Sequence, residues 1–298
     1  MKTPTMVCSV GVLVLLPLAI VIGCAAPVPE TVVFPDENLD AVIRDALDKP
    51  AEEAITPAEL AGLTVLYATQ QGITDLSCIE YCTNLTELML NINQIVDIAP
   101  LASLTNLEFL DMAQNQISDL SPLASLTNLT YLRLRYNQIS DFSHLASLTN
   151  INQLNLGMNQ INDILPLASL TNLTRLGLHG NQISDLSPLS SLVNLTYLKL
   201  ESNQIRDLSS LSSLINLTYL RLESNQISDL LPLVSLTNLT DLLLHDNQIS
   251  DLSFLVENSG LDKGDRLQIT NNNLDLSEGS EDLENIRILE ARGVRVDY

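Results

Sequence analysis

Two sets of side chains in this sequence have types and spacings that could do chemistry. The chain has three histidines, and nine aspartates recur every 22 residues: His144, His179 and His245; Asp75, Asp97, Asp119, Asp141, Asp163, Asp185, Asp207, Asp229 and Asp251. Imidazoles and carboxylates can hold a metal or serve as general acids and bases. No histidine, however, lies at a spacing from a nucleophile or a carboxylate pair that is typical of a catalytic site. Gly-rich phosphate loops, H-E-x-x-H and G-x-S-x-G are absent. The sequence therefore predicts a non-catalytic protein without a cofactor.

The regular aspartates favour a structural role instead. We expect each carboxylate to accept backbone N–H bonds at the start of a following helical turn, as an N-cap does. A ladder of calcium sites is the alternative, but the Gly-rich nonapeptide of calcium-binding β-rolls is missing. The preferred interpretation is capping, with no metal bound.

An asparagine column has the same period: Asn93, Asn115, Asn137, Asn159, Asn181, Asn203, Asn225 and Asn247, with Gln71 in the first copy. We expect each asparagine to turn inward and bond the backbone of its own turn and of the adjacent coil. A buried peptide group left unpaired costs about 1–3 kcal/mol. The column is therefore predicted to be structural.

Both columns belong to one repeat, exemplified by LTNLTYLRLRYNQISD from Leu126. The 22-residue frame restarts without insertion or deletion at Leu60, Cys82, Leu104, Leu126, Leu148, Leu170, Leu192, Leu214 and Leu236. Such a period predicts a solenoid. Leu132 and Leu134 are two residues apart and so share one face of a short strand, which we expect to point inward. Parallel strands about 4.8 Å apart would stack these coils, and no coil could bury its apolar set alone.

The core L-x-x-L-x-L-x-x-N-x-I matches the leucine-rich repeat, and S-D-L-S-P-L resembles the 22-residue repeats of internalin-like bacterial surface proteins. The resemblance implies an α/β solenoid, a right-handed superhelix with a curved parallel sheet on its concave face. It also implies short 3₁₀ or α turns on the convex face, helical caps at both ends, and protein–protein recognition.

The chain divides into four predicted segments: a lipoprotein signal peptide (1–24), a tether and helical N-terminal cap (25–59), nine repeats (60–257), and a degenerate tenth repeat with a helical C-terminal cap (258–298). Asp36 should cap a helix with an apolar stripe that Pro50 ends, and a second helical turn should begin at Thr56. We expect a tenth strand within Leu267–Leu274, a closing helix that ends before Gly293, and an edge strand at Val294–Val296.

The N-terminus has the features of an export signal. Lys2 precedes a mostly apolar run from Val7 to Ile22, which has the length of a secretory signal. The run ends in VIGC, which resembles the lipobox of bacterial lipoproteins. This implies that Cys24 carries lipid and holds an exported, extracytoplasmic protein to the bacterial cell envelope. An ordinary signal peptide is the alternative.

Cys78 and Cys82 form C-x₃-C. On a helical turn their Cα atoms would lie roughly 6 Å apart, within disulfide reach, and an exported location permits the bond. The preferred interpretation is two small apolar residues packed in the first repeats. No histidine stands at ligand spacing beside them, so a metal site is not expected.

The formal net charge is −22, which disfavours nucleic acid as a partner. Between residues 82 and 257 there are six Lys or Arg, and all except Arg206 lie at predicted outward strand positions. Aromatic residues join them there, and such side chains dominate protein interfaces. The candidate ligand-binding residues are Phe109, Tyr131, Arg133, Arg135, Arg175, Tyr197, Lys199, Tyr219 and Arg221.

We therefore expect a monomer that binds a protein ligand through its concave face. Glutamates beside Lys199 and Arg221 make the patch mixed in charge, so a protein or a glycan suits it better than a polyanion. A carbohydrate-binding module and a structural envelope spacer are the alternatives. In the spacer, pairs such as Asp111 with Arg133 and Arg175 with Tyr197 would be simple cross-strand contacts.

Overall fold

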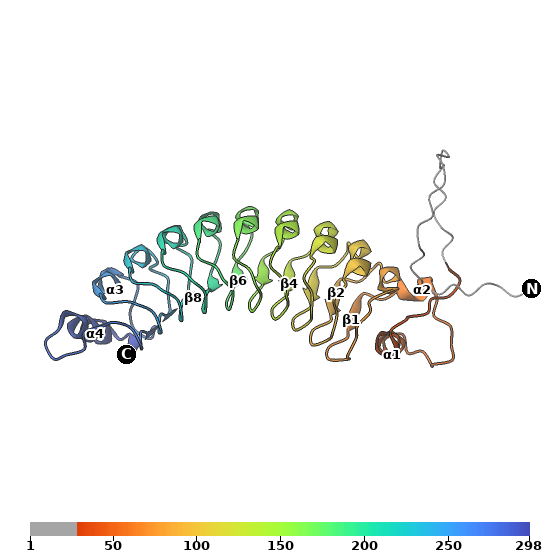
Figure 1. Ribbon diagram of the computed structural model, residues 1–298, viewed down its shortest axis with the longest axis horizontal. Helices are drawn as coiled ribbons and strands as arrows, with labels where there is room; N and C mark the ends of the chain where they lie inside the picture. The colour runs from red at the N-terminus through yellow and green to blue at the C-terminus, as the bar shows by residue number, and fades with distance from the viewer. Residues whose placement is uncertain (1–28) are drawn as a thin grey trace, which may run out of the picture.

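The computed structural model describes residues 29–298, and the predicted signal peptide with Cys24 lies outside these residues. The described chain winds into an arc of stacked coils (Figure 1). One parallel sheet of 11 strands lines the concave side, with the strands in chain order. They are β1 (Val65–Tyr67), β2 (Glu87–Met89), β3 (Phe109–Asp111), β4 (Tyr131–Arg133), β5 (Gln153–Asn155), β6 (Arg175–Gly177), β7 (Tyr197–Lys199), β8 (Tyr219–Arg221), β9 (Asp241–Leu243), β10 (Arg266–Gln268) and β11 (Arg295–Asp297). The leucine-rich repeat solenoid predicted from the sequence is confirmed.

Short helical turns follow the convex side of the arc. They are η1 (Ile79–Tyr81), η2 (Ala99–Ser103), η3 (Ser121–Ser125), η4 (Ser143–Ser147), η5 (Leu165–Ser169), η6 (Ser187–Ser191), η7 (Ser209–Ser213), η8 (Leu231–Leu233) and α3 (Ser253–Glu257). All except α3 are 3₁₀ helices of three to five residues. The repeat leaves few residues for this side, so only one short turn forms in each coil.

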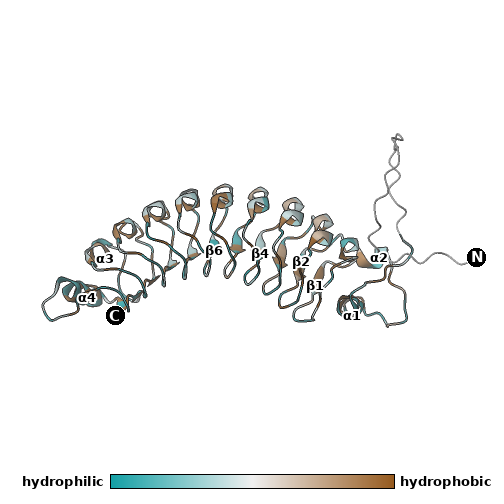
Figure 2. Ribbon diagram, in the orientation of Figure 1, coloured by the Kyte–Doolittle hydropathy of each residue, from teal (hydrophilic) through white to brown (hydrophobic). Residues whose placement is uncertain are grey.

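One continuous apolar core runs through the coils, from Val32 to Val294. Apolar residues recur in each coil, both in the strand and in the convex turn (Figure 2). In the coil that contains β4, the middle strand residue Leu132 and its neighbour Leu134 are buried, as are Phe142 and Leu145 in the convex turn. The strands pair with a shift of 22 residues, so that Leu132 lies opposite Leu154. Each leucine therefore packs against its equivalents in the adjacent coils.

The asparagine column bonds backbone, as predicted. Asn181 accepts a hydrogen bond from the Ile161 N–H at 3.0 Å. Its amide group donates to the carbonyls of Leu156 at 3.1 Å and Leu178 at 2.9 Å. The same arrangement recurs from Asn93 to Asn247, and each asparagine thereby ties its own coil to the preceding one.

The aspartate column also accepts backbone N–H bonds at the start of each convex turn, as predicted, although each aspartate lies one residue before the N-cap. Asp119 accepts from the N–H of Ser121 at 2.8 Å, where η3 begins. The N-cap residue of this turn is Leu120, whose side chain is buried in the core. The carboxylate therefore reaches over the N-cap from the preceding residue. These bonds hold the pKa of Asp119 below its ordinary value, with the Ser121 backbone bond as the main cause.

Helices close both ends of the core, as expected. Asp36 caps α1 (Glu37–Ala46) and accepts from the N–H groups of Asn38 and Leu39. Its second oxygen accepts from Thr74 and Asp75, so one side chain joins the cap to the first coil. A short helix, α2 (Pro57–Leu60), follows and begins with a capping box.

At the C-terminus, α4 (Glu281–Arg292) is followed by Gly293 as its C-cap, whose φ of 97° suits glycine. β11 supplies the predicted edge strand, shifted by one residue. The tenth strand is shorter than the predicted segment Leu267–Leu274 and begins one residue earlier, with three residues as in every other coil.

Cys78 and Cys82 are both buried, and no disulfide joins them. Cys82 occupies the first leucine position of its repeat and packs in the core. Burial raises the pKa of the Cys82 thiol to about 12. The preferred packing role agrees with this arrangement. No helix within residues 29–298 combines the length and apolar character that a membrane span needs.

Candidate functional site

The candidate binding residues lie on one face because of the strand geometry. In β4 the middle leucine is buried, whereas Tyr131 and Arg133 on either side of it are partly exposed. Arg135, two residues further on, continues the same alternation and is also half-buried. Since the strands pair with a 22-residue shift, equivalent residues form columns that run along the arc. All nine predicted residues accordingly line the concave side.

The aromatic residues form two stacked pairs. Phe109 and Tyr131 lie on adjacent strands with ring centroids 4.1 Å apart and planes 9° from parallel. Tyr197 and Tyr219 repeat the arrangement at 4.3 Å and 5°. Adjacent parallel strands lie about 4.8 Å apart, so equivalent rings on neighbouring strands are close enough to stack. Two coils, those of β5 and β6, separate the pairs.

Cationic side chains lie against these rings. The Arg175 guanidinium lies 4.2 Å from the centre of the Tyr197 ring, and the Lys199 ammonium 5.6 Å from it. Arg133 lies 5.4 Å from the centre of Tyr131 and forms an ion pair with Asp111 at 3.1 Å. The two cross-strand contacts considered from the sequence therefore both exist.

A hollow of about 280 Å³ opens between the two aromatic pairs. It is lined by six of the nine predicted residues together with the residues of β5, part of β6 and one buried leucine of β4: Tyr131, Leu132, Arg133, Arg135, Gln153, Leu154, Asn155, Arg175, Leu176, Gly177, Tyr197 and Lys199. The hollow exists because Gln153, Asn155 and Gly177 are shorter than the tyrosines on either side. Phe109 and Tyr219 extend it on each side through their stacked partners.

His179 belongs to this face and was not among the predicted residues. A Cβ on Gly157 would lie 2.1 Å from Cε1 of His179, so the imidazole covers the glycine in the adjacent coil. Burial, with nearby Lys199, Arg135 and Arg221, lowers the pKa of His179 to about 4. The imidazole is therefore neutral near pH 7, and its Nδ1 is buried without a hydrogen bond. The glycine opposite it is the sequence signal that could have identified it.

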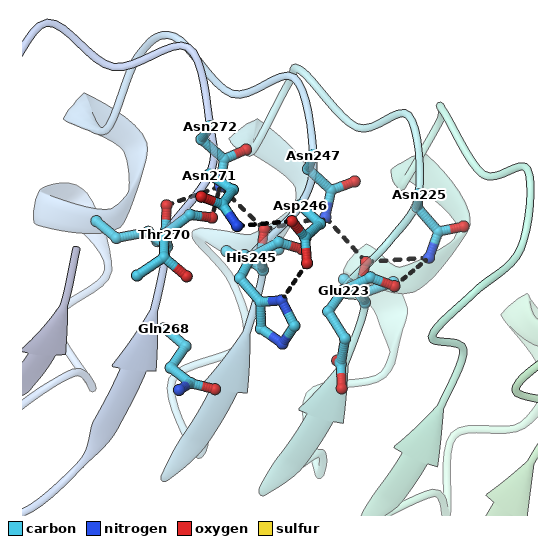
Figure 3. Close-up of polar contacts among 12 residues, drawn as sticks. Glu223, Asn225, His245, Asp246, Asn247, Gln268, Thr270, Asn271 and Asn272 are labelled. Carbon is cyan, nitrogen blue, oxygen red and sulfur yellow. Dashed lines mark hydrogen bonds and ion pairs between the residues drawn. The ribbon is translucent and has the colours of Figure 1, made fainter.

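The two coils of the second aromatic pair also carry acidic side chains on this face, Glu201 and Glu223. Arg221 forms ion pairs with Glu223 and, at 3.8 Å, with Glu201. Burial is the main cause that raises the pKa of Glu201. Glu223 and His245 lie on adjacent coils, and His245 contacts Asp246 at 2.8 Å (Figure 3). No three His, Cys, Asp or Glu side chains within residues 29–298 are grouped as a metal site.

Comparisons with known proteins agree with this architecture. A family profile described as "Leucine Rich repeats (2 copies)" matches residues 83–125, 105–147, 127–169 and 171–213, and a second, "Leucine Rich repeat", matches 213–230. No curated protein matches the chain.

Two solved structures resemble this chain over most of its length. An internalin (inlF) from Listeria monocytogenes is 35% identical, with a TM-score of 0.59, over 89% of this chain and 90% of the other. An internalin C2 (inlC2) of the same organism is 38% identical, with a TM-score of 0.62, over 85% and 99% of the two chains.

A more distant likeness is to the ectodomain of the Arabidopsis thaliana receptor kinase GASSHO1/SCHENGEN3, solved in complex with CASPARIAN STRIP INTEGRITY FACTOR 2. It is 25% identical, with a TM-score of 0.59, and the match covers 66% of this chain and 25% of the receptor chain. Leucine-rich repeat proteins typically serve protein–protein recognition, and the internalin fold is a recognition scaffold rather than a catalytic one. The repeats, the parallel sheet and these identities together place the chain in the internalin family of leucine-rich repeat proteins.

Proposed function

We propose that this protein binds a partner protein through its concave face. The binding surface is the part of that face that holds the two aromatic pairs and the hollow between them. The observation that carries the proposal is the gathering of basic and aromatic side chains there. On a chain of net charge −22, all but one of the Lys and Arg residues between 82 and 257 lie on this face. The solved complex of the plant receptor kinase ectodomain supports a protein ligand for a domain of this architecture.

The geometry suits an interface because the anchoring side chains are already ordered. Tyr197 is held between Arg175 and Tyr219, which lie on the two neighbouring strands. Side chains fixed before binding lose little conformational entropy when a partner docks. Tyr and Arg are also the residues that contribute most often to interface hot spots.

The same stacking disfavours the carbohydrate alternative. A sugar ring usually needs an open aromatic face, but Arg175 covers one face of Tyr197 and Tyr219 the other. The ring edges stay accessible, since Tyr197 and Tyr219 are both half-buried. Edges and guanidinium groups are suited to contacts with a protein surface.

We further propose that Cys24 anchors the protein by lipid to the extracytoplasmic side of a bacterial cell envelope. VIGC at residues 21–24 supports this, after its apolar run. Mass spectrometry of the N-terminal peptide should show a lipid-modified Cys24, and Cys24→Ala should move the protein from the membrane to the soluble fraction. An unmodified Cys24 in membrane-bound protein would refute the anchor.

The binding proposal can be tested by cross-linking and pull-down with a triple variant, Tyr197→Ala, Tyr219→Ala and Arg221→Ala. We expect this variant to lose the partner that the native protein captures. A matched control changes Leu165 and Arg206 to Ala, because Leu165 is 65% exposed on the convex side. Equal capture by the triple variant would overturn the proposal, and retention on a glycan array that depends on the same tyrosines would favour a carbohydrate ligand.

A further inference from the structure

The cations around the hollow differ in whether they have an acidic partner. Arg133 is paired with Asp111. Among the described residues, by contrast, no carboxylate lies within ion-pair distance of Arg135, Arg175 or Lys199. Three unneutralised positive charges therefore share the walls of one hollow on a strongly acidic protein.

Aromatic contacts hold these three side chains in place. Arg175 and Lys199 both lie over the ring of Tyr197, and Arg135 lies 5.7 Å from the centre of the Tyr136 ring. The Nε atom of Arg135 is buried and makes no hydrogen bond. A buried donor without an acceptor is unfavourable, so an added acceptor at this position would be stabilising.

The floor of the hollow adds neutral polar groups. Gln153 and Asn155 lie between the cationic walls, and Gly177 contributes no side chain. A Cβ at position 177 would lie 2.9 Å from Oδ1 of Asn155, so the glycine allows the Asn155 amide to lie against the floor of the hollow. An acidic side chain entering here would meet amide and guanidinium donors. None of the described residues that line the hollow is acidic.

We propose that this hollow is a carboxylate pocket, which binds the side chain of an aspartate or glutamate on the partner protein through Arg135, Arg175 and Lys199. The pocket deepens the proposed protein-binding function and rests on it. Guanidinium and ammonium groups form short, charge-assisted hydrogen bonds with carboxylates.

The surroundings of the pocket select against a polyanion. Asp111 lies on one side of it, and Glu201 and Glu223 lie on the other. A nucleic acid or a sulfated polysaccharide would bring further negative charges against these groups, whereas one carboxylate on a peptide would not. The lowered pKa of His179 is consistent with a positive field in the pocket, since Lys199 and Arg135 contribute to it after burial.

The pocket can be probed with three blocked peptides: acetyl-Ala-Glu-Ala-amide, and the same peptide with Gln or Lys at its centre. NMR would follow the arginine Nε–H signals of the intact protein during titration. We expect saturable shifts at Arg135 and Arg175 with the Glu peptide, weakened by salt. The double variant Arg175→Gln and Lys199→Gln should bind it about tenfold or more weakly, because two charge-assisted bonds are lost.

Arg206→Gln is the matched control, since Arg206 lies off this face and bonds Gln226. It should bind the Glu peptide with unchanged affinity. Equal shifts from the Gln peptide, or unchanged affinity in the double variant, would overturn the pocket.

The pull-down with the tyrosine variant separates the two proposals. If capture is lost but the Glu peptide causes no shift, the pocket is refuted and the proposed protein-binding function stands. If the Glu peptide binds but capture is unchanged, the proposed function is refuted. Circular dichroism of each variant, compared with the native protein, excludes unfolding as the cause of lost binding.

Discussion

Removing one asparagine of the asparagine column tests how the coils are held together. Asn181 accepts from the Ile161 N–H and donates to the carbonyls of Leu156 and Leu178. Asn181 and the Ile161 amide are both buried, so water cannot easily replace the lost partner. Asn181→Ala therefore removes these three short hydrogen bonds, and a longer one to the His179 carbonyl at 3.3 Å, from the interior of the solenoid.

The three short bonds are not equivalent, because each carbonyl, including that of His179, has a second donor. Asn159 also donates to Leu156 at 2.9 Å, and Asn203 also donates to Leu178 at 3.1 Å. Only the Ile161 N–H is left without a partner. An orphaned buried donor costs about 1–3 kcal/mol, and each of the other two bonds contributes about 0.5 kcal/mol, so we expect a loss of about 2–4 kcal/mol.

Shared carbonyls make a sharper prediction for double variants. In Asn159→Ala with Asn181→Ala, the Leu156 carbonyl loses both of its side-chain donors. The combined loss should exceed the sum of the single losses by about 1–3 kcal/mol. Asn115→Ala with Asn181→Ala is the control, because these residues share no acceptor and lie three coils, about 14 Å, apart. Their losses should add within about 0.5 kcal/mol.

Urea unfolding followed by far-ultraviolet circular dichroism would give these free energies of unfolding. Hydrogen exchange of the Ile161 amide supplies a local measurement, and it should accelerate in Asn181→Ala but not in Asn115→Ala. Strict additivity for the neighbouring pair Asn159 and Asn181 would refute the shared-carbonyl reasoning. A loss below about 0.5 kcal/mol for Asn181→Ala would refute the buried-donor reasoning as well.

Three further predictions concern pH, the N-terminal cap and the buried Cys82 thiol. His179 has a pKa of about 4 in the folded protein against 6.5 ordinarily, so the unfolded chain binds more protons between these values. Stability should therefore fall as pH drops from 6.5 to 4, by about 1–2 kcal/mol after allowance for partial exposure, and His179→Gln should flatten this part of a pH series of urea midpoints. Asp36→Ala should lose about 2 kcal/mol in the same unfolding assay, because five bonds to α1 and the first coil are lost. If Asp36→Ala lost no more stability than Asp36→Asn, the result would contradict a role for the carboxylate charge. Cys82, with a thiol pKa of about 12, should resist iodoacetamide at pH 8 until urea unfolds the protein, and rapid labelling of the native Cys82 peptide in mass spectrometry would contradict its burial.

The repeat period predicts the scaffold well because each coil depends on local rules. Leu132 must face inward for its coil to stack, and an asparagine must satisfy the turn that precedes Ile139. The aspartates were correctly predicted to accept backbone N–H bonds at the start of each turn, but the buried leucine between Asp119 and Ser121 takes the N-cap position itself. Sequence spacing alone does not distinguish a carboxylate at the cap from one that reaches over it.

The binding face is harder to predict, because side-chain contacts there depend on neighbours 22 residues away. The columns correctly bring Tyr197 and Tyr219 onto adjacent strands, which explains their stacking. His179 lies over Gly157 because a large residue follows a small one in that column, and the buried Glu223 is paired with Arg221. These packing details are a property of three successive coils and not of one repeat.

The uninterrupted 22-residue period has a consequence for how such a protein can change. Excising two complete periods between β4 and β7 would leave each remaining strand a partner in the same register, and would bring Tyr131 directly alongside Tyr197. The carboxylate pocket would vanish and a continuous ribbon of aromatic rings would replace it. Gain or loss of whole periods can therefore rewrite specificity in a single genetic event, while point substitutions refine what each new arrangement recognises.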